Sequence, residues 1–155
     1  MILEFNQASN PEEKKILTTR AKSVKDLTEF IMFMEDLTNT AKAHADECVG
    51  IAANQLWKIP NEPPPAIFIA RIHLNGEELW KIFVNPSIHG TGKKMVWPEN
   101  CMSLKGRKAK IKKRDKNVII TYFDPKDQID KTEKYFGYDA RIIQHEFDHL
   151  QGKLI

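Results

Sequence analysis

Residues 145–149 read His145-Glu146-Phe147-Asp148-His149, an HExxH sequence within a helix predicted from Tyr138 to Gln151. In an α-helix, residues four positions apart lie one turn apart on the same face, so the two imidazoles can bind one cation. The glutamate between them is then directed at the group that the cation activates. The stretch therefore predicts a catalytic metal site with His145 and His149 as ligands and Glu146 as a catalytic residue.

The third ligand of this metal site is expected upstream of the helix. In zinc peptidases with HExxH it usually lies downstream, and only six residues follow His149 here. A thiolate is a suitable soft partner for two imidazoles, which makes Cys101, in the segment ENCMS (99–103), the candidate. Cys48 and Cys101 are the only cysteines, too few for a disulfide framework, and this favours a metal or catalytic role for one of them.

The composition excludes several classes of protein. With 155 residues, 41% of them hydrophobic and 29% charged, the chain is typical of one ordinary globular domain over residues 1–155. It has no apolar run long enough to span a membrane. Residues 1–15 lack the features of a secretory signal or transit peptide, which predicts a cytoplasmic location. The net charge of +3 is too small to indicate nucleic-acid binding by itself.

The periodicity of apolar residues predicts an α+β fold. Spacings of three or four residues indicate an amphipathic helix from Val24 to about Ala45. Two apolar, β-branched runs flank Asn75-Gly76 and predict a hairpin of strands 66–73 and 79–84. Further strands are expected around Ile88, around Ile111, at 118–123 and near 134–136. A helix, several antiparallel strands and a final helix stopped by Gly152 are an α+β arrangement rather than alternating βαβ units.

The segment from Lys105 to Lys116 is strongly basic, with eight Lys or Arg against one Asp. It has two interpretations. The simpler one is a solvated edge strand whose lysines prevent aggregation between sheets. The other is a surface for phosphate backbones such as those of ribosomal RNA.

Three segments of the chain resemble, in order, the motifs of peptide deformylases. CVGIAANQ (48–55), ENCMS (99–103) and HEFDH (145–149) are similar to the family patterns G-x-G-x-A-A-x-Q, E-G-C-x-S and H-E-x-D-H. FVNPSI (83–88) and the residues around HEFDH are also similar, so the likeness covers nearly the whole chain. It implies antiparallel sheets around a central metal-binding helix. It also implies removal of the N-formyl group from the N-terminal formylmethionine of nascent peptides, with release of formate.

The resemblance implies a role for each residue of the reacting centre. Cys101, His145 and His149 would hold one divalent metal, most often Fe(II) in this family, although Zn or Ni can occupy the site. A fourth position would stay open for water. Glu146 would take a proton from that water and pass it to the leaving amine. The oxyanion would receive hydrogen bonds from the side-chain amide of Gln55 and the backbone N–H of Met102.

The same likeness suggests how the peptide is bound. Val49 and Gly50 would contact the peptide, which binds as an added strand. Tyr138 and Ile142 share the face of the metal helix that carries the ligands and would form the methionine pocket with Trp97. Packing in the core is the alternative role for Tyr138 and Ile142.

Two acidic residues near the metal ligands, Glu99 and Asp148, also have expected roles. Glu99 would brace the metal-binding loop through a basic partner, either Arg114 or Lys113. Asp148 would either support the metal ligands or face solvent.

Two positions depart from the family motifs. Cys48 stands where the first motif begins with glycine, and Asn100 stands where glycine precedes the metal-binding cysteine. If that second position requires a positive φ, asparagine tolerates it best after glycine. Its larger side chain would lie where the substrate backbone passes, so Asn100 is expected to contact substrate and to lower or alter activity.

Bacterial deformylases commonly continue into a C-terminal helix that docks on the ribosome. We expect this chain to be a minimal member without that helix, and we expect any ribosome contact to use Lys105 to Lys116. Two alternatives to an active deformylase stay open at this point. One is a deformylase-like peptide-binding protein with weak turnover, and the other is a different HExxH metallopeptidase.

Overall fold

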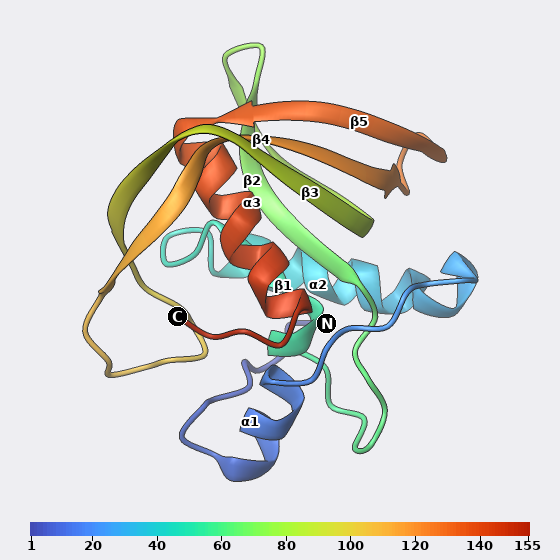
Figure 1. Cartoon of the computed structure of the whole chain (residues 1–155). Coiled ribbons are helices and arrows are strands. Elements are labelled where there is room, and N and C mark those ends of the chain that lie inside the picture. The colour runs from blue at the N-terminus through green and yellow to red at the C-terminus, as the bar shows by residue number, and fades with distance from the viewer.

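The computed structural model describes residues 1–155 and confirms the α+β class. Five strands form one antiparallel sheet in chain order, and α3 runs beneath its curved surface through the middle of the molecule (Figure 1). The elements in chain order are α1 (Pro11–Leu17), α2 (Ile31–Ala43), β1 (Gly50–Ala52), β2 (Ile67–Leu74), β3 (Glu77–Glu99), β4 (Lys110–Asp124), β5 (Ile129–Phe136) and α3 (Gly137–Leu150). None of the helices has the length and apolarity that crossing a bilayer requires.

The predicted hairpin is confirmed. β2 and β3 pair antiparallel on either side of Asn75 and Gly76, whose φ angles of 52° and 81° fit a tight turn. The two strands expected at 79–84 and around Ile88 are wrong as separate elements, because β3 is continuous from Glu77 to Glu99. Two register shifts bend this long strand, between Val84 and Ser87 and between Thr91 and Lys94. Its last part curves away from β2 and β5 while it stays paired with β4 (Figure 1).

Alternating residues of β2 bury both faces of the sheet. Phe68, Ala70 and Ile72 belong to the core that also contains the buried side chains of α3. Ile67 and Ile69 belong to a second core shared with α2. Successive side chains of a strand point to opposite faces, so β2 contacts one helix on each face, and its first four residues, 67–70, are all apolar and buried. This packing fixes α3 against the sheet and thereby fixes the position of its two histidines.

The predicted N-terminal helix is correct in type but begins too early. Val24 lies outside it, and its backbone N–H donates a hydrogen bond to Asn85 Oδ1 at 2.7 Å. A 3-10 turn over Leu27–Phe30, capped by the Asp26 carboxylate, precedes α2. The sequence interpretation also missed α1 and β1, because seven and three residues are too short to show a periodicity.

The basic segment lies on a partly open edge. β4 pairs with β3 from its start at Lys110, whereas β5 joins only at Asn117, so residues 110–116 have a strand on one side. Gln144 of α3 occupies the other side: its Oε1 accepts from the Asp115 N–H at 2.9 Å, and its Nε2 donates to the Asp115 carbonyl at 2.8 Å. The edge-strand interpretation therefore describes this half of β4, and α3 closes part of the edge.

Candidate metal centre and active site

The structure brings together the three predicted metal ligands. His145 and His149 come from one face of α3, and Cys101 comes from the loop that follows β3. Their donor atoms all lie within 4.8 Å of one another, and Cys101 Sγ is 3.3 Å from His149 Nε2. One thiol and two imidazole nitrogens that converge in this way suit a divalent cation of borderline softness.

The orientation of the two imidazoles also fits a metal ion. Nδ1 of His145 lies 2.8 Å from Glu99 Oε1, and this contact directs Nε2 toward the cluster. His149 directs Nε2 at the Cys101 sulfur. Burial lowers the pKa of His149 well below its usual value and keeps the ring neutral, which is the form that binds metals.

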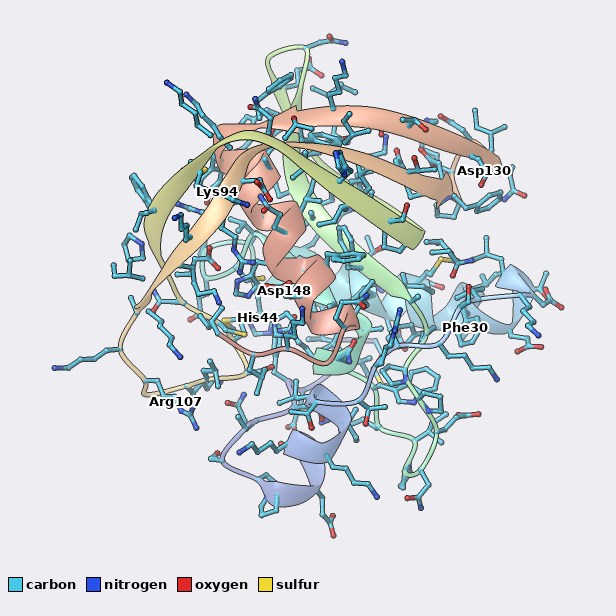
Figure 2. The ribbon with its side chains drawn as sticks, viewed as in Figure 1. Phe30, His44, Lys94, Arg107, Asp130 and Asp148 are labelled. Carbon is cyan, nitrogen blue, oxygen red and sulfur yellow. The ribbon has the colours of Figure 1, made fainter.

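Arg114 joins the two segments that carry the ligands. Its guanidinium donates to both oxygens of Glu99, at 2.9 and 2.8 Å, and to Asp148 Oδ2 at 2.5 Å. Burial opposes ionisation of Glu99, but the hydrogen bonds from Arg114 and His145 outweigh it and hold the pKa of Glu99 at about 2. Arg114, rather than Lys113, is the basic partner of Glu99. Asp148 faces this arginine from α3 rather than solvent, and its place on that helix is visible in Figure 2.

Glu146 is a buried carboxyl group beside the cluster. The residue is 3% exposed, and its Oε2 has no hydrogen-bond partner in the chain. Burial raises the pKa of Glu146 to about 7. A carboxyl group with a pKa near neutrality can both accept and return a proton, which is what an acid–base catalyst requires.

Gln55 presents its amide to the cluster in a fixed orientation. Its Oε1 accepts a hydrogen bond from the Ala52 N–H at 2.9 Å, so the amide nitrogen points the other way. That nitrogen lies 3.5 Å from Cys101 Sγ and 3.3 Å from Ser103 Oγ. Met102 follows the cysteine, and its carbonyl accepts from Gln7 Nε2 at 2.9 Å.

A cavity of about 310 Å³ opens beside these groups. Val49, Gly50, Asn100, Tyr138 and Ile142, all expected to contact substrate, line it together with Gln55, Cys101, Met102, His145 and Glu146. The sequence interpretation missed Glu47, Pro98 and Arg141, which line it as well. The helical spacing could have indicated Arg141, because it lies one turn before His145 on α3.

Trp97 is the exception among the expected pocket residues. It does not line the cavity and is 51% exposed, and its ring lies against the guanidinium of Arg141. Trp97 shares a strand face with Glu99 but lies two residues further from the metal-binding loop. The end of β3 therefore places Trp97 outside the lining of the cavity.

Comparison with known proteins identifies the family. The family model described as polypeptide deformylase matches residues 3–155. The chain belongs to the polypeptide deformylase family. It is similar to a peptide deformylase of Clostridium beijerinckii, at 32% identity over 94% of this chain and 98% of the relative.

Two solved structures share the fold. One is a probable peptide deformylase from Synechococcus phage S-SSM7, with a TM-score of 0.80, 23% identity and coverage of 98% of this chain and 96% of the other. The second is a peptide deformylase from Thermotoga maritima, with a TM-score of 0.78, 24% identity and coverage of 99% and 95%. Deformylases are metal-dependent hydrolases, and Cys101, His145 and His149 form a group able to hold the metal.

The two departures from the deformylase motifs have different surroundings. Asn100 is not among the residues with positive φ, so glycine is not required there for backbone conformation. Its exposed side chain lines the cavity, which keeps its effect on substrate binding a prediction. Cys48 is buried, and burial raises the pKa of its thiol to about 12, so the group is a neutral part of the cavity wall. Neither cysteine forms a disulfide.

Proposed function

We propose that this protein is a metal-dependent peptide deformylase that hydrolyses the N-formyl group of an N-terminal formylmethionine and releases formate. The observation that carries the proposal is a cluster of one thiol and two imidazoles beside a cavity that a buried carboxyl group and an oriented amide also line. The match of residues 3–155 to the deformylase family supports the same reaction.

The metal would be held by Cys101 Sγ and the Nε2 atoms of His145 and His149. When bound, it supplies a Lewis acid that lowers the pKa of water and polarises the formyl oxygen. Fe(II) is the proposed ion in the cell, and Zn or Ni can replace it. Glu99 and Arg114 keep the His145 ring in the orientation that leaves Nε2 free for binding.

Protein side chains perform the proton transfers and stabilise the developing charge. Glu146 takes the proton of the attacking water and later gives it to the leaving nitrogen, for which a pKa of about 7 suits both steps. The amide nitrogen of Gln55 and the backbone N–H of Met102 donate hydrogen bonds to the oxyanion. The peptide extends along Val49 and Gly50, with its methionine side chain against Ile142.

The experiment that tests this proposal measures metal content and turnover together. The protein is purified anaerobically, its metal is quantified, and formate release from formyl-Met-Ala-Ser is followed. Glu146→Ala is expected to keep its metal and to lose turnover by at least about 100-fold, because the acid–base group is gone. Glu35→Ala removes an exposed carboxylate of α2 and should leave turnover unchanged. A metal-loaded wild-type protein that releases no formate would instead support a peptide-binding role.

We also propose that the loop between β3 and β4 contacts ribosomal RNA. Lys105, Arg107 and Lys108 are exposed on this loop, and Figure 2 shows Arg107 at the rim of the molecule. Arg114, in contrast, is buried by Glu99 and Asp148 and cannot contribute to such a surface. Changing the three loop residues to glutamate is expected to weaken sedimentation with ribosomes while turnover of formyl-Met-Ala-Ser is retained. Unchanged sedimentation with ribosomes would refute the proposed contact.

A further inference from the structure

Arg141 lines the cavity without the carboxylate partners that hold the other arginine of this region. It is half-buried on α3, and its guanidinium lies 4.9 Å from the ring centroids of both Trp97 and Tyr138. Arg114, by comparison, is fixed by two carboxylates. Contacts with aromatic faces hold a guanidinium plane in place but use none of its N–H donors. The edge of Arg141 is therefore oriented and available to a ligand.

The charges around Arg141 favour an anionic ligand. Lys112 lies directly opposite Trp97 in the β3–β4 pairing, so both side chains project from the same face of the two strands. Glu47, Glu99 and Glu146 also line the cavity. Glu99 is paired with Arg114, Glu146 is buried beside Gly50, and the side chain of Glu47 is 67% exposed. Pairing therefore offsets the charge of Glu99, and solvent and salt screen the charge of Glu47. A guanidinium fork matches the two oxygens of a carboxylate.

The geometry of an extended peptide indicates which of its side chains would supply that carboxylate. In an extended peptide the side chains of residues 1 and 3 point to the same face and lie about 7 Å apart. Arg141 is the direct neighbour of Ile142 on α3, and both residues line the same cavity. When the methionine side chain lies against Ile142, the third side chain lies on the same face of the peptide and is turned toward the wall that carries Arg141.

We propose that Arg141 is a specificity-determining residue that binds an acidic side chain at the third position of the formylated peptide. The proposal rests on the deformylase function proposed above. The contact is remote from the scissile amide and is the same before and during the reaction. It therefore strengthens binding and lowers KM without changing kcat.

The test compares formyl-Met-Ala-Glu and formyl-Met-Ala-Gln, both amidated at the C-terminus so that no terminal carboxylate competes. The wild type is expected to favour the glutamate peptide by about tenfold in kcat/KM, mainly through KM, because a charge-assisted hydrogen bond discriminates by about that factor. Arg141→Gln should abolish the preference, and Arg141→Lys should retain part of it. Glu47→Gln should increase the preference. Lys42→Gln removes one positive charge, as Arg141→Gln does, but at an exposed position of α2, and should leave the preference unaltered.

A binding measurement separates failure of this proposal from failure of the proposed function. The Glu146→Ala protein, loaded with Zn, is titrated with both peptides by calorimetry, and the glutamate peptide is expected to bind about tenfold more tightly. Equal affinities, or a preference that survives in Glu146→Ala/Arg141→Gln, would overturn the role of Arg141. Formate release from both peptides at equal kcat/KM would refute the acidic preference alone, whereas no release from either would refute the deformylase function.

Discussion

Gly50 is the residue at which one added methyl group would most disturb the proposed reaction. A Cβ atom there would lie 2.6 Å from Glu146 Oε1 and 2.8 Å from its Cγ, and the buried carboxyl side chain has little room to move. Gly50→Ala is therefore expected to displace the acid–base group and to lower kcat by about 100-fold while the metal content is retained. Formate release and metal analysis of the purified variant provide the measurement.

A second glycine provides the control for this substitution. Gly76 in the β2–β3 turn has a φ of 81°, and a Cβ atom added there would meet no other atom within 4 Å. Gly76→Ala should therefore cost stability through backbone strain but leave kcat unchanged. Wild-type turnover in Gly50→Ala would contradict the placement of Glu146 beside Gly50.

Residues of the site differ in how far the sequence could predict them. His145 and His149 follow from helical spacing alone, and Cys101 follows from ligand chemistry together with the family motif. The family resemblance gave Glu99 a basic partner but could not choose between Arg114 and Lys113. It also could not identify Asp148 as the second partner of Arg114, because the two carboxylates lie 15 and 34 positions from it on other elements. The stacking of Arg141 on Trp97 depends in the same way on the curvature of β3, which no local pattern encodes.

At the scale of elements, the sequence predicted which segments form helices and strands better than it predicted where each helix or strand begins and ends. Residues 85–92 contain Pro86, Gly90 and Gly92, which are residue types that commonly interrupt strands. The structure instead places the register shifts of β3 at Val84/Ser87 and Thr91/Lys94, so bulges accommodate two of these residues within one strand. Bulges depend on the partner strand, and for that reason periodicity within β3 alone could not reveal them.

Gln144 gives α3 a role in closing the sheet. Gln144→Ala is expected to destabilise the protein by about 1–3 kcal/mol, because the Asp115 N–H and carbonyl lose their partners on this side of β4. Urea unfolding provides the measurement, with Lys116→Ala, an exposed neighbour on β4, as the control. Equal urea midpoints for Gln144→Ala and the wild type would show that water can replace the hydrogen bonds of the Gln144 amide without loss of stability.

The first turn of α3 is also tied to β2, and this contact depends on pH. Asp139 accepts from the His73 backbone N–H at 3.0 Å and lies 2.9 Å from its Nδ1, and the hydrogen bond to Asp139 raises the pKa of His73 above 6.5. Because the folded-state pKa is the higher one, the stabilisation is complete below pH 6.5 and is lost as the pH rises through the raised value.

The stability difference between the wild type and His73→Asn should accordingly be largest in mild acid and should shrink toward alkaline pH. Denaturant unfolding across this range measures it, and added salt should reduce it because the pair is exposed. A difference that is independent of pH would mean that the ring charge contributes nothing.

At the scale of the whole molecule, the site lies where segments distant in sequence meet. The loop after β3 supplies Cys101, α3 supplies both histidines, and the turn after β1 supplies Gln55. Within the protein, Arg114 and the cores on both faces of the sheet hold these segments together. A metal bound to Cys101 and the two histidines adds a direct link between the loop and the helix, so metal binding is coupled to global stability.

Metal loading should therefore raise the unfolding temperature of the whole protein. A ligand that binds only the folded state, at a thousandfold excess over its Kd, stabilises it by about 4 kcal/mol, or about 10 °C for a chain of this length. Calorimetry of the metal-free protein with and without Zn measures the shift. Cys101→Ala should lose most of it, whereas Cys48→Ala removes a thiol that lies outside the ligand cluster and should retain it. An equal shift in Cys101→Ala would mean that the stabilising ion binds at another site. The cluster of Cys101, His145 and His149 would then not be the metal site on which the proposed reaction depends.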